Sequence, residues 1–182
     1  MREPVNHLDI VVEVALGLRV LGLAPVLVGG MALVILGSRR VTRDFDLVIS
    51  PPGPQLTNVV DLVYDRGMEL VSRLAKNGDV AATITNRRVA SSRLRIDGPP
   101  TAHFYNPLTG LRIDLLFDFP IAAATLAERS TRVRLGQHGL QVAGETDLLL
   151  LKKIAADRRQ APGDAEDIAF LERRRAARGE IG

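Results

Sequence analysis

Residues 26–49 read VLVGGMALVILGSRRVTRDFDLVI, and this stretch decides how the chain folds. It overlaps an apolar run, residues 20–38, that carries no charge and is long enough to cross a bilayer as a helix. The run nevertheless contains Pro25 and the pair Gly29 and Gly30 near its centre, which are weak helix formers, and charged residues follow it at once. We therefore do not interpret it as a membrane span. The expected elements are a strand, a glycine turn, a short helix and a second strand, at residues 26–28, 29–30, 31–36 and 45–49.

Hydrophobic periodicity outside this stretch predicts further helices and strands. Apolar residues at helical spacing predict helices over residues 6–21, 55–76, 145–159 and 164–178. The middle third, residues 79–118, is predicted to be mostly extended, with strands over residues 93–96, 102–105 and 111–117. Two further short strands are predicted over residues 132–135 and 140–142. This mixture predicts an α+β fold in a single domain, residues 1–182, with a sheet-containing core over residues 1–143 and a C-terminal helical part over residues 144–182.

The composition limits the chemistry that the chain can perform. There is no cysteine, which excludes disulfides, thiolate metal sites and a cysteine nucleophile. Asp9 and Glu13 interrupt the apolar segment where a signal peptide would keep its hydrophobic region free of charge, so we expect a cytoplasmic protein. The formal net charge of +3 and the pI near 9.8 favour anionic partners such as nucleotides or RNA. The histidines are not spaced as metal ligands, and we interpret all three as incidental: His7, His103 and His138.

A pair of carboxylates follows the glycine turn. On a strand of period two, Asp44 and Asp46 project from one face, while the apolar residues beside them project from the other. Glycine adopts backbone angles that other residues resist, and its missing side chain lets a phosphate approach the amides at the start of the next helix. Two carboxylates beside such a phosphate cradle indicate a magnesium site, because Mg²⁺ prefers carboxylate oxygens and keeps water and substrate phosphates as its other ligands.

The segment LRIDLLFDF, residues 111–119, supplies candidates for a third carboxylate. Its apolar residues alternate and form a core face, which leaves Arg112, Asp114 and Asp118 on the opposite face. Either aspartate is able to join the first two. We favour Asp114 over Asp118 because it lies nearer the middle of the strand.

These residues carry a family resemblance. The pattern of an apolar residue, Gly-Gly and then Asp-x-Asp, here LVGG and RDFDL, resembles the nucleotidyltransferase superfamily related to DNA polymerase beta. Within it, the chain resembles the AbiEii-type nucleotidyltransferases, many of which are toxins of bacterial toxin–antitoxin pairs. Three further matches support this resemblance: Arg40 and Thr42 in RRVTRDFD, the helix DLLLLKKIAADR, and the segment DAEDIAFL. The resemblance covers most of residues 26–171, and it departs from the family pattern at Gly163, where a basic residue often precedes the aspartate at position 164.

The resemblance implies a polymerase-beta-like fold, in which helices pack a mixed or antiparallel sheet and C-terminal helices follow. It implies that Mg²⁺ or Mn²⁺ is held by Asp44, Asp46 and Asp114, which with Lys152 form the catalytic set. The nucleotide-binding residues that it implies are Gly29, Gly30, Arg40, Lys152 and Asp167. Lys152 is assigned to the triphosphate rather than its neighbour Lys153 because of its spacing from Asp147 in the family pattern.

By the same resemblance, the chain would move a nucleoside monophosphate from a nucleoside triphosphate to an acceptor hydroxyl and release pyrophosphate. Asp114 would bind the attacking hydroxyl and draw off its proton. The acceptor expected first is tRNA, and the expected protein partner is a cognate antitoxin, with no membrane partner. Two arginine groups are either solvated or form a phosphate-tracking surface for RNA: Arg87, Arg88, Arg93 and Arg95, and Arg173, Arg174, Arg175 and Arg178.

Other functions stay open at this stage. A small-molecule or protein nucleotidyltransferase would use the same residues on another acceptor. A non-catalytic member would bind nucleotide or RNA, although binding alone does not require three metal-directed aspartates. A structural interaction protein is favoured only if the aspartates do not converge.

Thr42, two residues before Asp44, suggests a regulatory hypothesis. A phosphate on its hydroxyl would add about two negative charges to a metal and triphosphate site, and we expect it to inactivate the protein. The alternative is that a β-branched residue at this position only favours the strand.

Overall fold

The computed structural model describes residues 6–159 and 161–179. The strands are β1 (Val26–Val28), β2 (Asp44–Ile49), β3 (Glu69–Leu74), β4 (Val80–Ile84), β5 (Thr101–Tyr105), β6 (Arg112–Phe117), β7 (Thr131–Leu135) and β8 (His138–Val142). The helices are α1 (His7–Val20), α2 (Gly29–Ile35), α3 (Leu56–Tyr64), α4 (Arg87–Asp97), α5 (Ala123–Arg129), α6 (Glu145–Arg159) and α7 (Pro162–Ala177), with a 3-10 turn η1 at Gly53–Gln55.

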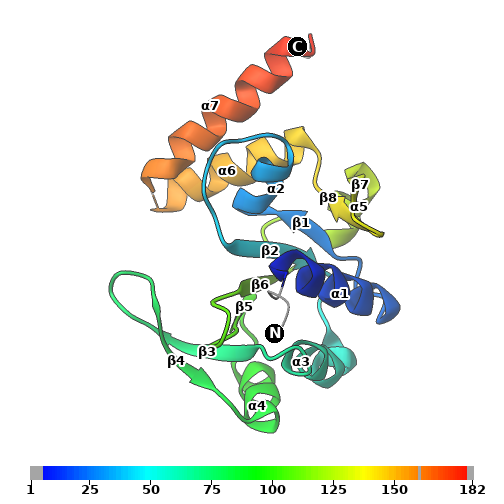
Figure 1. Cartoon of the computed structure of the whole chain (residues 1–182), viewed down its shortest axis with the longest axis vertical. Coiled ribbons are helices and arrows are strands. Elements are labelled where there is room, and N and C mark those ends of the chain that lie inside the picture. Colours follow the sequence, from blue (N-terminus) through cyan, green and yellow to red (C-terminus); the bar gives the residue numbers. More distant parts are fainter. Residues whose placement is uncertain (1–5, 160, 180–182) are drawn as a thin grey trace, which may run out of the picture.

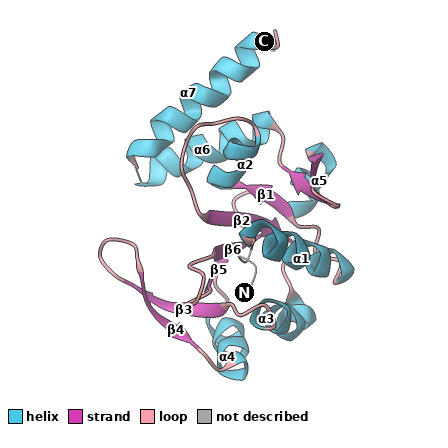
Figure 2. Cartoon of the chain, in the orientation of Figure 1, coloured by secondary structure: helices cyan, strands magenta, loops and turns pink. Residues whose placement is uncertain are grey.

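All eight strands form one sheet, in the order β4-β3-β5-β6-β2-β1-β8-β7. The pairs β2–β6 and β1–β8 are parallel, and the remaining pairs are antiparallel. Figure 1 shows α2, α6 and α7 above strands β1 and β2, and α1, α3 and α4 below them. The predicted α+β fold, a mixed sheet packed by helices and followed by C-terminal helices, is therefore confirmed (Figure 2).

The predicted order of strand, short helix and strand is confirmed for residues 26–49, but Gly29 and Gly30, predicted as a separate turn, form the first two residues of the helix. β1 and β2 pair antiparallel, with Val28 opposite Asp46, and α2 lies between them in the chain. Gly29 is the first residue of α2 and has φ +69°, in the left-handed region that glycine adopts readily. The apolar run is thus divided between a strand and a seven-residue helix. Across the described residues, no helix combines the length and the apolarity that crossing a membrane requires.

The helix predicted over residues 55–76 is wrong in its second half. α3 covers only the first half, and β3 takes the second and pairs with β4 and β5. Gly67, with φ +74°, turns the chain between them, and Leu70 enters the core from a strand. The spacing of Leu70, Val71 and Leu74 also fits a helix, so the hydrophobic periodicity of this segment did not distinguish a helix from a strand.

The strand predicted over residues 93–96 is also wrong, because α4 occupies this segment. The side-chain oxygen of Asn86 caps the helix by accepting hydrogen bonds from the backbone N–H groups of Arg88 and Val89. The buried residues of α4 recur at helical spacing, at positions 90, 91 and 94. Helix α5 was not predicted, whereas the other predicted strands correspond to β5, β6, β7 and β8 and the two C-terminal helices to α6 and α7.

One hydrophobic cluster connects the sheet with the helices around it. It extends from Val11 of α1 through the apolar residues of β1, β2 and β6 to Leu148 of α6 and Leu171 of α7. The C-terminal helices therefore pack on the same core as the sheet, which fixes α6 opposite β2 and β6. This placement creates the cleft described next.

Candidate active site

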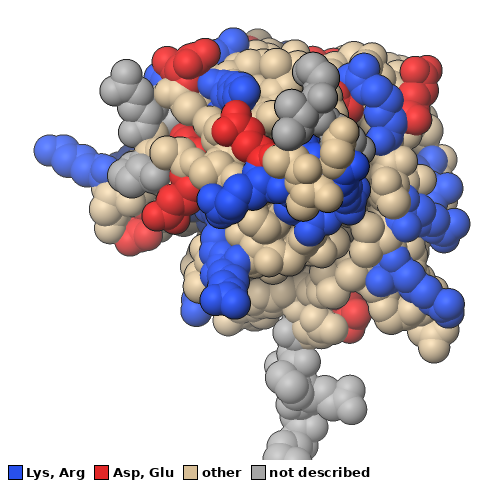
Figure 3. Space-filling model, turned by 90° about the horizontal axis from the view of Figure 1, so that it is seen from above, with Lys and Arg blue, Asp and Glu red and all other residues tan. Residues whose placement is uncertain are grey.

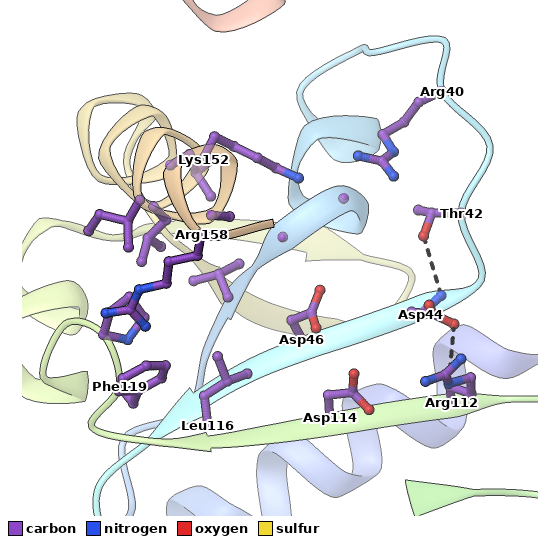
Figure 4. Close-up of a pocket in the computed structure, with 18 residues that line it drawn as sticks. Arg40, Thr42, Asp44, Asp46, Arg112, Asp114, Leu116, Phe119, Lys152 and Arg158 are labelled. Atoms are coloured by element: carbon purple, nitrogen blue, oxygen red, sulfur yellow. Dashed lines mark hydrogen bonds and ion pairs between the residues drawn. The ribbon is translucent and has the colours of Figure 1, made fainter. Parts of the chain in front are cut away.

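Two neighbouring strands, β2 and β6, carry the three predicted carboxylates on one face of the sheet. The parallel register of β2 and β6 places Asp44 opposite Arg112 and Asp46 opposite Asp114. Because side chains alternate along a strand, these four residues share one face, while Phe45 and the apolar residues after it are buried. The structure thus brings the three predicted aspartates to the same face of adjacent strands (Figure 4).

A cleft of about 490 Å³ lies over this face. Strands β2 and β6 form its floor, and the start of α2 and one face of α6 form its walls. Among the residues predicted from sequence, those that line the cleft are Gly29, Gly30, Arg40, Thr42, Asp44, Asp46, Asp114 and Lys152. Asp167 lies behind this lining and reaches it through contacts with Arg40 and Lys152.

The glycine pair leaves room for two charged side chains. A Cβ atom on Gly29 would lie 2.0 Å from Oδ2 of Asp46, and one on Gly30 would lie 2.9 Å from Cζ of Arg40. Neither approach is compatible with a larger residue unless the carboxylate or the guanidinium moves. Glycine is therefore needed here for the close packing of Asp46 and Arg40, in addition to the positive φ of Gly29.

His103 is a neighbour of the site that sequence reasoning missed. It lies opposite Asp114 in the antiparallel pair of β5 and β6, and its Nδ1 is 2.9 Å from Oδ1 of Asp114. This contact raises the pKa of His103 above its ordinary value of 6.5, against burial, which lowers it. The two residues are eleven positions apart in sequence, so only the pairing of β5 with β6 would have revealed the contact.

Arg112 and Thr42 lie beside Asp44 at one end of the cleft. Nε of Arg112 is 3.8 Å from Oδ1 of Asp44, and the hydroxyl of Thr42 accepts a weak hydrogen bond, at 3.4 Å, from the backbone N–H of Asp44 (Figure 4). β2 begins at Asp44, so Thr42 is not part of the strand, yet it lines the same cleft.

Asp118, the alternative third carboxylate, lies elsewhere. It is exposed, has φ +49° just after the end of β6, and accepts a hydrogen bond from the backbone N–H of Ala123 at the start of α5. Asp118 therefore shapes the turn into α5, and Asp114 is the aspartate of this segment that lines the cleft.

Lys152 belongs to a buried ion cluster. Its Nζ lies 2.7 Å from Oδ2 of Asp167 and 3.7 Å from Oδ1 of Asp164, and Arg40 contacts Asp167 from the loop before β2. We call these four residues the α6–α7 ion cluster. The side chain of Lys152 is 8% exposed and those of both aspartates still less, whereas Arg40 is 31% exposed, so the two positive and two negative charges form a cluster that is buried except at Arg40.

The neighbouring lysine has a different environment. Lys153 is half exposed and pairs on the outside with Glu172, at 3.2 Å. The structure thus separates the two lysines, and Lys152 is the one that reaches from α6 toward the cleft (Figure 4). Asp164 joins the cluster although Gly163 replaces the basic residue that the family pattern has before it.

The two arginine groups do not form one surface. α4 lies at the lower end of the molecule in Figure 1 and α7 at the upper end. Several of these arginines also have partners within the chain: Arg87 pairs with Asp65, Arg93 with Asp97, and Arg174 with Glu145. Viewed from the α7 end, Lys and Arg side chains spread over the surface with Asp and Glu side chains among them (Figure 3).

The donor set of the cleft fits a hard divalent cation. Asp46 and Asp114 lie beside each other across the strand pair, and Nδ1 of His103 is 2.9 Å from the buried Oδ1 of Asp114. Carboxylate oxygens are the ligands that Mg²⁺ and Mn²⁺ prefer. In the part of the chain that the structure describes, no three potential ligands already stand together as a complete set, and the carboxylate of Asp44 lies toward Arg112.

Solved structures similar to this chain have a nucleotidyltransferase fold. The lincomycin-bound lincosamide antibiotic adenylyltransferase LnuA is similar over 91% of this chain and 94% of its own, with a TM-score of 0.55 and 12% identity. A nucleotidyltransferase-like antigen from Paracoccidioides brasiliensis is similar over 91% of this chain and 74% of its own (TM-score 0.53, 16% identity). The antibiotic-resistance factor ANT(2'')-Ia is similar over 92% of this chain and 84% of its own (TM-score 0.54, 11% identity).

At these identities, the similarity establishes the fold. The polymerase-beta-like nucleotidyltransferase fold predicted from sequence is confirmed. Neither a protein-family model nor a curated protein sequence matches the chain, and the AbiEii-type resemblance stays a prediction.

Proposed function

We propose that the protein is a nucleotidyltransferase that moves a nucleoside monophosphate from a nucleoside triphosphate to an acceptor hydroxyl and releases pyrophosphate. The observation that supports this proposal is that Asp44, Asp46 and Asp114 lie on one face, at the floor of a cleft whose opposite wall presents Lys152. Phosphoryl transfer depends mainly on positioning and on charge stabilisation, and this cleft supplies side chains suited to both.

The three aspartates would hold Mg²⁺ or Mn²⁺. A divalent cation bound there would neutralise charge on the attacking and leaving oxygens of an in-line displacement. Asp114 is the proposed group for the acceptor: its carboxylate would accept a hydrogen bond from the attacking hydroxyl and then its proton. His103, in contact with Oδ1 of Asp114, would keep this carboxylate in one orientation.

Lys152, with Arg40, would bind the phosphates on the other side of the cleft, next to Gly29 and Gly30. Asp164 and Asp167 support this role, because they hold the ammonium in place before the nucleotide arrives. Asp167 also contacts Arg40, so we propose that it positions both cations rather than contacting the nucleotide itself.

For the acceptor, we propose tRNA, in a cytoplasmic protein that a cognate antitoxin controls. The support for this part is the resemblance of RDFDL and DAEDIAFL to the AbiEii-type toxins, together with the net charge of +3. The arginines of α4 and α7 lie at opposite ends of the molecule, so they do not add one continuous RNA surface to this support.

A small hydroxylated molecule is the second candidate acceptor. The similarity to LnuA, a lincosamide antibiotic adenylyltransferase, extends over nearly all of both chains, and ANT(2'')-Ia is an antibiotic-resistance factor. These comparisons favour a small acceptor, because proteins of similar extent and fold act on or confer resistance to antibiotics.

The test is incubation of the purified protein with Mg²⁺ and each α-labelled nucleoside triphosphate, with total tRNA in one series and lincosamides and aminoglycosides in another. Asp46→Asn is the inactive variant, and Asp118→Asn is the matched control, because Asp118 lies outside the cleft. We expect label in tRNA with the wild type and with Asp118→Asn only. Label in a small molecule would replace tRNA as the acceptor, and absence of both transfer and nucleotide binding would contradict the proposed function.

A further inference from the structure

The cleft has two chemically different ends. Around Asp44 and Asp114 its lining is charged and hydroxylated, whereas beyond Asp46 and Lys152 it becomes apolar. Leu116 and Phe119, at the end of β6 and after it, lie at this end with Arg158 of α6 (Figure 4), and further apolar lining of the cleft comes from Pro120, Leu151, Ile154 and Ala155. Arg158 is the only charged residue that lines this end among the residues that the structure describes.

The guanidinium group of Arg158 lies over the aromatic ring of Phe119 at this apolar end. The guanidinium carbon of Arg158 lies 5.1 Å from the centre of the Phe119 ring (Figure 4). Among the described residues, no carboxylate forms an ion pair with Arg158, and its side chain is exposed. Both planar groups are thus available to a ligand that enters the cleft.

Helix α6 sets the distance between this pair and Lys152. The residues of α6 that line the cleft are 148, 151, 152, 154, 155 and 158, which lie on one side of the helix. Arg158 follows Lys152 by six residues, which corresponds to roughly 9 Å along the helix axis. A ligand whose phosphates lie at Lys152 would need to extend by about the length of a nucleoside to reach Arg158.

We infer that the pair of Arg158 and Phe119 is the nucleobase site of this cleft, and that it holds the base by stacking. This inference rests on the proposed function. Nucleobases are flat and have π faces that stack on aromatic rings and on guanidinium planes, and the apolar side chains around the pair exclude water from them. A hydroxyl-rich acceptor would find few partners here, whereas Thr42, Asp114 and Arg112 offer them at the opposite end.

The composition of this end also determines selectivity. Apart from Arg158, the described side chains that line it have no donor or acceptor with which to read the edge of a base. Stacking is tolerant of base identity and increases with ring area. The site therefore accepts all four nucleotides and binds purines a few-fold more tightly than pyrimidines.

The test compares binding of a nucleotide with binding of its phosphates alone. Dissociation constants of Mg²⁺ complexes of α,β-methylene analogues of ATP and CTP, and of inorganic tripolyphosphate, are measured for the wild type, Arg158→Ala and Arg158→Lys. Arg93→Ala, on α4 and outside the cleft, is the matched control. Phe119→Leu is a second variant, which keeps an apolar side chain but removes the ring.

We expect Arg158→Ala and Phe119→Leu each to weaken binding of the ATP analogue by about tenfold and to leave tripolyphosphate binding unchanged. Arg158→Lys keeps the charge without the plane, and we expect it to resemble Arg158→Ala. An equal loss of ATP and tripolyphosphate binding in Arg158→Ala would overturn the inference, because Arg158 would then be a phosphate ligand.

Two further results would also overturn it. Unchanged binding of the ATP analogue in Arg158→Ala and Phe119→Leu, with a raised KM for the acceptor, would assign this end of the cleft to the acceptor. In this outcome, and in the equal loss of ATP and tripolyphosphate binding described above, the wild type still binds the nucleotide, so the proposed function stands. Failure of the wild type to bind any nucleotide would remove the proposed function and this inference with it.

Discussion

Two groups of charged side chains lie on either side of the cleft, and they differ in charge balance and in burial. On the floor, Asp44, Asp46 and Asp114 are three carboxylates with Arg112 and His103 beside them. The Asp44 side chain is 45% exposed and that of Asp114 is 14% exposed, so water and ligands reach this face most readily at Asp44. On the opposite side, the α6–α7 ion cluster has two cations and two carboxylates, almost fully buried except for Arg40.

This difference separates what the two groups can do. The aspartates carry an excess of negative charge where solvent and ligands have access, which suits them to bind a cation. The α6–α7 ion cluster is neutral without any ligand, so its contribution is to hold Lys152 and Arg40 in fixed positions. We therefore expect substitutions on the floor to lower activity with little effect on stability, and substitutions of Lys152 or Arg40 in the cluster to lower stability as well as activity.

The largest expected effect is on activity. Asp46→Asn removes the charge of one central carboxylate, and we expect it to lower nucleotidyl transfer by about a thousandfold, or about 4 kcal/mol. We expect its free energy of unfolding to change much less than its activity, because the amide has nearly the same shape as the carboxylate that it replaces. Transfer rates and urea unfolding of the same preparation measure both effects. A large loss of stability in this variant would remove the distinction between the two groups.

The next effect is on stability. Lys152→Met removes the cation that lies between the buried carboxylates of Asp164 and Asp167, and we expect it to lower the free energy of unfolding by about 3 kcal/mol. Urea denaturation measures the change. Lys153→Met is the matched control on the same helix, because its partly exposed pair with Glu172 is worth at most about 1 kcal/mol. Equal changes in the two variants would contradict the cluster's structural role.

Gly29→Ala should lower both stability and activity. The positive φ of Gly29 strains an alanine by about 1–2 kcal/mol, and the new Cβ displaces the carboxylate of Asp46, so activity falls as well. Gly37→Ala has φ +99° but no atom within 4 Å of the new Cβ, so it carries the strain without the displacement. Comparison of unfolding free energies and transfer rates separates the two contributions. Equal activity of the two variants would contradict the packing of Gly29 on Asp46.

Thr42 provides a test at the edge of the carboxylate face. Thr42→Glu places a negative charge beside Asp44, and we expect it to lower transfer by at least about tenfold because it repels the triphosphate. Thr42→Val is the control without charge and should keep most of the activity. Mass spectrometry of the protein from its native cell would show whether the residue is phosphorylated, and full activity of Thr42→Glu would count against the regulatory hypothesis.

The smallest effect is a titration. Asp114 raises the pKa of His103 above 6.5, so protonated His103 favours the folded state below that pH, and this contribution disappears as the pH rises through the raised value. We expect Asp114→Asn to lower the pKa of His103, and bound Mg²⁺ to lower it too, because a cation at Asp114 opposes the protonated ring. An NMR titration of the His103 ring measures the pKa, and a value unaffected by Asp114→Asn would contradict the contact.

The sequence predicted the carboxylate face better than its surroundings. Asp44, Asp46 and Asp114 follow from period-two alternation, which is a local property, and the order of strand, short helix and strand from Val26 to Ile49 is as predicted. Lys152 was placed in the cleft only by its family resemblance, since Lys153 adjoins it on the same helix. The spacing of apolar residues did not separate α3 from β3, because the turn at Gly67 depends on one positive φ.

Local sequence patterns do not predict contacts between elements that are far apart in the sequence. His103 meets Asp114 because β5 pairs with β6 in one particular register, and the sequence does not state that register. The same holds for Arg158 and Phe119, which approach from a helix and from the end of a strand. Both contacts arise from tertiary packing, and only the fold brings the partners together.

The most direct test of the central claim is the position of a metal ion. Crystals of the protein with Mn²⁺ and an α,β-methylene nucleoside triphosphate would give an anomalous signal from the metal. We expect a peak between the carboxylates of Asp46 and Asp114, with Asp44 turned away from Arg112 and the phosphates extending toward Lys152. A nucleotide bound elsewhere, or a metal that binds none of the three aspartates, would contradict it.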